Sequence, residues 1–183
     1  GELGIEHVEA HFVRLGPVAL GCHKFELSSI IDKSTNKPCR RDAIERARQA
    51  LQFDVWAWVF MPDHVHLIVH PRLRKYDMAA IRRLIKEPVS RKALAWIREQ
   101  APEWLAKIER TRGARKEYLF WQSGGGYDRN ITEGTTLLKM IDYLHENPCR
   151  KGLVTRAWDW KWSSAAWYVR QGSTPLIPDP IPP

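Results

Sequence analysis

Cysteines and long apolar runs are scarce in this 183-residue sequence. Its three cysteines, Cys22, Cys39 and Cys149, are scattered and include no CxxC pair. This pattern predicts neither a disulfide framework nor a cysteine zinc site, and it favours a reducing cytoplasm. No stretch approaches the ~20 apolar residues that span a bilayer, and residues 1–7 lack the basic and apolar regions of a secretory signal. We therefore expect a cytoplasmic protein without a membrane segment.

Acidic residues are also in the minority, with 21 Asp and Glu against 29 Lys and Arg, which gives a net charge of +8. Such a charge favours polyanions, of which nucleic acid is the commonest, although it also serves solubility. Hydrophobic residues make up 44% and charged residues 27%, a globular balance that argues against disorder. The nine tryptophans can stack on unpaired bases, but most buried indoles fill cores.

The apolar pattern predicts one α+β domain over residues 1–172, with only mixed apolar and polar residues in its first ~40 positions, followed by a proline-rich mobile tail at 173–183. The expected order resembles the βαββαβ pattern of a ferredoxin-like antiparallel sheet with helices packed on one face. Residues 76–100 predict a long basic helix with Pro88 as a candidate break, and Thr132 is the expected N-cap of a helix over 133–147. Strands are expected near residues 11–15, 53–60, 64–70 and 117–121.

A His-x-His pair is the first candidate site. His64 and His66 are two residues apart, so on a strand both imidazoles project from one face while Val65 points to the other. Two neutral imidazoles at this spacing can share a divalent cation, although such pairs also occur on strands without a metal. His70 has the same parity but lies roughly 13 Å further along the strand, which favours a structural role.

A Tyr-x-x-x-Asn pair is the second candidate site. Tyr143 and Asn147 are four residues apart and therefore share one helix face. The amide oxygen of Asn147 suits Mg²⁺ or Mn²⁺, and the phenolic oxygen of Tyr143 is a potential nucleophile toward phosphorus. Lys139, one turn upstream, is placed to hold a phosphate. The structural alternative is a half-buried aromatic at Tyr143 and a helix C-cap at Asn147.

In this order the motifs resemble those of the single-tyrosine HUH nucleases. His64-Val65-His66 corresponds to the histidine, hydrophobic, histidine triad of that family. Tyr143 with Asn147-Pro148 is similar to the tyrosine helix of one branch, the REP-associated tyrosine transposases, relatives of the small insertion-sequence transposases. The resemblance covers residues 53–168, whereas the first fifty residues match poorly. Other similar segments are Trp58–Asp63, Phe120-Trp121-Gln122, Gly124–Gly126, Asp128-Arg129-Asn130 and Trp160–Ser164.

This resemblance implies a transposase that cleaves and rejoins single-stranded DNA beside hairpins through a 5′-phosphotyrosine intermediate. Tyr143 would be the nucleophile, while His64, His66 and Asn147 would hold one Mg²⁺ or Mn²⁺. Family members include monomers and homodimers, and a DNA-bound protein would associate with the nucleoid. Basic side chains would follow the DNA backbone and aromatic rings would stack on unpaired bases. The expected DNA contacts are Arg82, Arg83, Arg112, Arg115, Trp121, Tyr127, Arg129 and Lys139.

Three alternatives stand beside this interpretation. A domesticated, catalytically silent protein would keep hairpin-DNA binding and lose cleavage. A metal hydrolase of small molecules would use the histidine pair and would need an acidic third ligand, a role for which the adjacent Asp63 is expected to face the wrong way. RNA could replace DNA as the partner, since charge and aromatic content do not distinguish the two.

Overall fold

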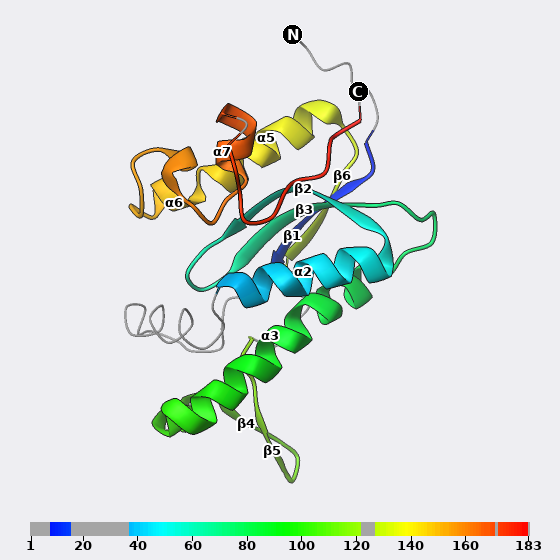
Figure 1. The fold of residues 1–183 in the computed structure, drawn as a ribbon. Coiled ribbons are helices and arrows are strands. Elements are labelled where there is room, and N and C mark those ends of the chain that lie inside the picture. The colour runs from blue at the N-terminus through cyan, green and yellow to red at the C-terminus, as the bar shows by residue number, and fades with distance from the viewer. Residues whose placement is uncertain (1–7, 16–36, 122–126, 171, 183) are drawn as a thin grey trace.

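The structure is a computed structural model that describes residues 8–15, 37–121, 127–170 and 172–182 (Figure 1). Most of the atypical N-terminal segment, Gln122 and the predicted glycine loop lie outside the described residues. In chain order the elements are β1 (Ala10–Leu15), α2 (Lys37–Leu51), β2 (Phe53–Phe60), β3 (Val65–Pro71), α3 (Met78–Gln100), η1 (Pro102–Trp104), α4 (Leu105–Ile108), β4 (Glu109–Arg112), β5 (Arg115–Tyr118), β6 (Tyr127–Ile131), α5 (Gly134–His145), α6 (Asn147–Arg150), η2 (Ala157–Asp159) and α7 (Ala165–Arg170).

Four strands form an antiparallel sheet in the order β2-β3-β1-β6. This is the strand order of a ferredoxin-like βαββαβ unit, so the predicted α+β class with an antiparallel sheet is confirmed. The fourth strand, however, is β6 and not the segment at 117–121. Residues 115–118 pair locally with β4 and form a separate two-stranded ribbon, because a very short turn brings β4 and β5 together before either can reach the sheet.

Helices cover both faces of this sheet (Figure 1). On one face, α2 and α3 bury Ile44 and Ile81 against the strands. On the other face, α5 buries Leu137 and Ile141 against residues such as Ile68. The expected one-face arrangement therefore holds for α2 and α3 but is wrong for α5. The physical reason is that β2 and β3 are apolar on both sides, and an uncovered face would leave that surface in water.

Two helices differ in detail from their predictions. α3 continues through Pro88, which lacks a backbone N–H and so removes one helical hydrogen bond. The buried neighbours Ile85 and Val89 hold this stretch against the rest of the protein. Asp77 caps this helix by accepting a 2.7 Å hydrogen bond from the backbone of Ala79. The predicted cap at Thr132 is wrong, since α5 begins at Gly134 with no side-chain cap. No helix within the described ranges is long and apolar enough to cross a membrane.

The C-terminal segment packs on the sheet, so the prediction of a mobile tail is wrong for its described residues. The indole nitrogen of Trp58 donates to the carbonyl of Leu176 at 2.8 Å, and Leu176 is buried in the core. The Asp179 carboxylate accepts a 2.8 Å hydrogen bond from the backbone of Val55 and pairs with Arg48 at 3.2 Å. The prolines keep the segment extended, but the outer side of β2 supplies partners that hold it in place.

Candidate active site

His64 and His66 face each other on the α5 side of the sheet. His66 lies in β3, His64 directly precedes it, and both side chains are buried. Their Nε2 atoms are 2.9 Å apart. The Nδ1 atom of His64 bonds the carboxylate of Asp63 at 2.6 Å. When that nitrogen carries the proton, the lone pair of His64 Nε2 points toward His66, and the two rings offer nitrogen ligands to one point.

The surroundings set the protonation states of His66 and Asp63. Burial, and then the positive charges of His64 and Arg14, lowers the pKa of His66 to about 3, so the ring is neutral. The hydrogen bond with His64 lowers the pKa of Asp63 to about 2, so this carboxyl is ionised. Asp63 lies in the turn before β3, which lets it reach the His64 ring. It therefore orients the His64 ring, a role that the sequence analysis missed.

Phe12 connects the histidine pair to the predicted nucleophile. Its ring stacks on His66 with 5.3 Å between centroids, and it meets the ring of Tyr143 edge-on at 6.1 Å. Two motifs that lie almost eighty residues apart in the sequence, on β3 and α5, are thus joined through one side chain of β1. Tyr143 is 42% exposed, so its ring is accessible from solvent.

Asn147 is buried at the start of α6. Its amide nitrogen donates to the carbonyls of Tyr143 at 2.8 Å and Leu144 at 3.2 Å, at the end of α5. These bonds use the amide nitrogen, so the amide oxygen is the atom that Asn147 can offer to a cation. The alternative role as a helix C-cap and the predicted role as a ligand are therefore compatible.

The donor set fits one divalent cation of the Mg²⁺ or Mn²⁺ class. The Nε2 atoms converge, and the Nδ1 atom of His66 is buried without a hydrogen-bond partner. Among the described residues, no group of three or more His, Cys, Asp or Glu side chains could hold a metal. The acidic third ligand that a small-molecule hydrolase would need is thus not found in this part of the chain. Asn147 carries an amide oxygen, a kind of ligand that Mg²⁺ and Mn²⁺ accept.

Two arginines that the sequence analysis missed border the site. Arg14 lies directly opposite His66 in the pairing of β1 with β3, so both side chains share the α5 side of the sheet. Its Nε atom is buried and has no hydrogen-bond partner. The guanidinium of Arg150 lies over the ring of Tyr143, 4.5 Å from its centroid. Only the strand pairing could have indicated Arg14, whereas Arg150 follows the tyrosine motif closely in sequence.

The predicted DNA contacts separate into two groups. Arg129 pairs with Phe12 in the sheet and is therefore on the α5 side, where Lys139 is also exposed. The second group lies on the side of α2 and α3. There, a groove of about 960 Å³ runs between α3 and the β4–β5 ribbon and is lined by Arg82, Arg83, Arg112 and Trp121. Arg115 is exposed at the start of β5.

Several of these contacts have structural partners. Trp121 is buried, and its indole nitrogen donates to the carbonyl of Lys86 at 3.1 Å. This packing corrects the expectation that unpaired bases stack on Trp121. Arg82 forms a 2.7 Å ion pair with Asp128 of β6. Tyr127 begins β6, but its side chain lies outside the described residues.

The segment Trp160–Ser164 has a structural role. The Ser164 hydroxyl bonds the backbone of Trp58 in β2 and lies 2.7 Å from the Nε2 atom of His145 in α5. The indole of Trp160 donates to the carbonyl of Phe60 at 3.0 Å. This segment therefore fastens the helix that carries Tyr143 to the sheet.

Comparison with known proteins agrees with the motifs. No family model matches the chain. A Haemophilus influenzae protein described as a REP-associated tyrosine transposase is 24% identical over 124 residues, which is 68% of this chain and 65% of the relative. The match therefore spans less than two thirds of the relative's length. A solved structure described as a REP-associated tyrosine transposase bound to a REP hairpin has a TM-score of 0.62 at 17% identity, over 100% of this chain and 98% of that chain. The two chains share a fold, and the resemblance indicated by the motifs is confirmed.

Proposed function

We propose that this protein is a transposase-type enzyme that cleaves and rejoins single-stranded DNA beside a hairpin, with Tyr143 as the nucleophile. The observation that carries this proposal is that the ring of Phe12 contacts both Tyr143 and His66, whose Nε2 atom lies beside that of His64. The names of the curated relative and of the matched structure support the transposase class and hairpin DNA as the partner.

In the proposed cleavage, the phenolic oxygen of Tyr143 attacks the phosphorus of a DNA phosphodiester. A bond forms between this oxygen and phosphorus while the bond from phosphorus to the 3′ oxygen breaks. The phenolic proton ends on the 3′ oxygen, which leaves a free 3′-hydroxyl and a 5′-phosphotyrosine. Rejoining reverses the step with a 3′-hydroxyl as nucleophile. Because the intermediate keeps a phosphate ester, no ATP is required.

The remaining residues position the reacting groups. His64, His66 and the amide oxygen of Asn147 would hold one Mg²⁺ or Mn²⁺, which when bound neutralises charge on the non-bridging phosphate oxygens. Asp63 keeps the His64 ring in its orientation. Arg14 lies on the same face of the sheet as Phe12, and Arg150 lies over the ring of Tyr143. Both would place positive charge where a phosphate can be bound beside Tyr143.

A hairpin-binding protein without catalysis is the second candidate. The basic groove beside α3 favours it, because this groove lies away from Tyr143 and could hold DNA without cleavage. The two candidates differ in one product, a covalent protein–DNA adduct.

The test is incubation with labelled single-stranded hairpin DNA from the repeats that flank the gene, with Mn²⁺, followed by a denaturing gel. We expect an adduct with the wild type that disappears with a chelator and in Tyr143→Phe. The matched control is Tyr76→Phe, because Tyr76 is equally exposed but bonds His11 on the opposite side of the sheet. Binding without an adduct would favour the silent protein. If neither binding nor an adduct occurs on several hairpins, the proposed function is wrong.

A further inference from the structure

The β4–β5 ribbon projects beyond α3 from the rest of the molecule (Figure 1). It pairs only with itself, from Glu109 opposite Tyr118 to Arg112 opposite Arg115. Every residue from 110 to 116 is exposed. Gly113 has a φ of 62° at the first of the two turn positions, which suits a type II′ turn and the twist of a hairpin.

The base of the ribbon is packed against the rest of the protein, whereas its tip is exposed to solvent. The backbone of Leu119 donates to the carbonyl of Ile108 at 2.9 Å. Ile108 and Phe120 are buried beside Val89 of α3 in a second core. A two-stranded hairpin has no core of its own and is marginally stable when isolated. The ribbon is thus held out as an arm that adds little to the stability of the fold.

The tip of this arm carries an unfavourable charge arrangement. Arg112 and Arg115 face each other directly across the ribbon, and like charges in such a pair destabilise it. Across the groove, α3 presents Arg83 and Lys86. Burial and the neighbouring Arg82 lower the pKa of Lys86. A bound polyanion would relieve this repulsion.

We propose that the β4–β5 ribbon enters the major groove of a DNA duplex, the stem of the hairpin, while the basic groove beside α3 follows the phosphate backbone. The B-form major groove is about 12 Å wide and admits a two-stranded ribbon, whereas the minor groove, about 6 Å wide, does not. Four residues per strand give the ribbon a length of roughly 13 Å, enough to reach the base edges. The major groove of A-form RNA is too narrow for side chains to read, which favours DNA.

This arrangement separates stem binding from strand cleavage. The stem would lie on the side of α2 and α3, while Tyr143 lies on the α5 side. The exposed edge strand β6 connects the two: Asp128 bonds Arg82, which lines the groove, and the next residue, Arg129, is turned to the α5 side. The unpaired strand would cross this edge to reach Tyr143. This last step and the choice of a hairpin stem as the duplex rest on the proposed function.

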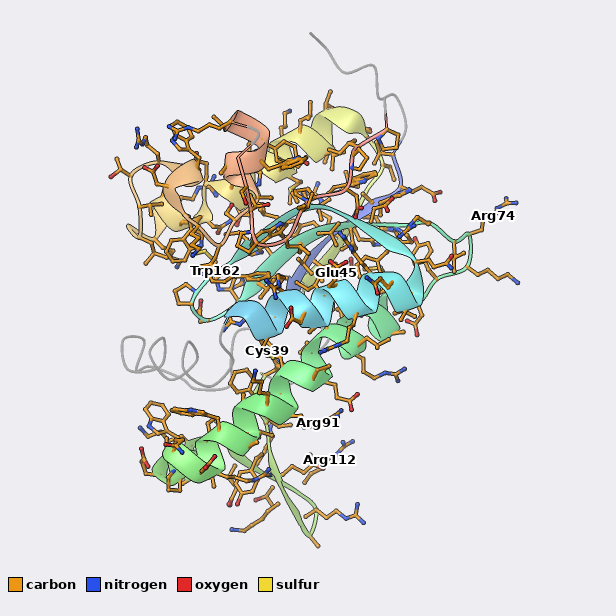
Figure 2. The ribbon with its side chains drawn as sticks, in the orientation of Figure 1. Cys39, Glu45, Arg74, Arg91, Arg112 and Trp162 are labelled. Atoms are coloured by element: carbon orange, nitrogen blue, oxygen red, sulfur yellow. The ribbon has the colours of Figure 1, made fainter. Side chains whose placement is uncertain are left out.

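The test measures binding of a blunt-ended DNA hairpin without a single-stranded extension, by fluorescence anisotropy over a range of salt concentrations. The variant is Arg112→Gln/Arg115→Gln. The matched control is Arg74→Gln/Lys75→Gln, which removes the same charge from exposed residues of the loop before α3, and Figure 2 shows Arg74 well apart from Arg112. For the ribbon variant we expect at least roughly tenfold weaker binding and a salt slope smaller by about two. The affinity of the control variant for the DNA hairpin should fall by about threefold or less. An RNA hairpin of the same sequence should bind the wild type more weakly than the DNA hairpin does.

Equal losses in the ribbon variant and the control would overturn the proposal, and so would equal binding of DNA and RNA stems. Unchanged melting temperatures would show that both variants fold. The covalent adduct assay separates this proposal from the proposed function. Ribbon-dependent stem binding by a protein that forms no adduct would support the ribbon while the proposed function fails. If the protein forms the adduct but its ribbon variant binds the stem as tightly as the control variant, the ribbon proposal fails while the proposed function stands.

Discussion

The ring of Phe12 stacks on the ring of His66, with 28° between their planes and 5.3 Å between their centroids. Because Phe12 also contacts Tyr143, one buried side chain sets the spacing between the metal-ligand candidates and the nucleophile candidate. The strand β1 that carries it belongs to the first fifty residues, which resemble the family poorly, yet it lies in the interior of the sheet.

Replacing Phe12 with leucine is expected to slow adduct formation by on the order of 10–100-fold, because small shifts between reacting groups cost that much. Hairpin binding should change little. The substitution should also lower the free energy of unfolding by about 1–3 kcal/mol. Phe53→Leu is the matched control, since Phe53 is fully buried on the opposite face. Equal effects of both substitutions on adduct formation would show that Phe12 contributes only stability.

Binding of Mn²⁺ to the folded protein should raise its melting temperature. At about 100 times Kd, a ligand of the native state stabilises by about 2.7 kcal/mol, or about 5–10 °C for a domain of this size. The shift should disappear in His66→Gln and return to the metal-free value when a chelator is added. His70→Gln is the control, because His70 lies on the same strand but stacks on Trp56 at 4.7 Å. A shift that survives His66→Gln would place the cation elsewhere.

The contacts of the C-terminal segment predict a measurable cost for Asp179→Asn. The substitution weakens the bonds to the Val55 backbone and to Arg48, and it relieves the repulsion that helps raise the pKa of Asp54. The net loss in unfolding free energy, measured by urea denaturation, should be about 1–2 kcal/mol. Asp159→Asn removes an exposed pair with Arg156 and should cost markedly less, because solvent screens the pair. Equal losses would mean that the segment is not held as described.

Tyr168 predicts a dependence of stability on alkaline pH. Its hydroxyl donates to the carbonyl of Trp56 at 2.6 Å, and burial of this end raises the pKa of Tyr168 to about 12. A raised pKa in the folded state contributes stability below the ordinary tyrosine pKa of about 10, which is lost as pH approaches 12. The free energy of unfolding of the wild type should exceed that of Tyr168→Phe by about 1 kcal/mol at pH 7 and 8. This difference should shrink at pH 11, and a constant difference would contradict the assignment.

Short-range patterns made most of the candidate site predictable. The spacing of His64 and His66 on a strand, and of Tyr143 and Asn147 near the end of a helix, fixes each pair locally. Asp63, Phe12 and Arg14 were not found, because their roles depend on a turn conformation and on strand pairing between distant segments. Spacing alone does not encode such contacts.

The same limit explains the errors in the fold. The apolar hairpin of β2 and β3 was predictable because both strands are buried on two faces. β6 was not predicted because Asp128, Arg129 and Asn130 lack the apolar alternation of a strand, although an edge strand tolerates such polar residues. Phe120 and Trp121 were read as a sheet strand, yet they fill the second core. Their apolar character predicts burial, but tertiary packing determines which core they join.

The C-terminal residues also occupy the outer hydrogen-bonding groups of β2. Phe60 donates to Trp162, Trp58 accepts from Ser164, and Val55 accepts from Asp179, at 2.8 to 3.0 Å. An apolar edge strand left bare offers a template on which another chain can add a strand. These residues therefore cover an edge on which another chain could add a strand. A chain cut before residue 160 should accumulate as aggregates joined edge to edge, even where its helices still form.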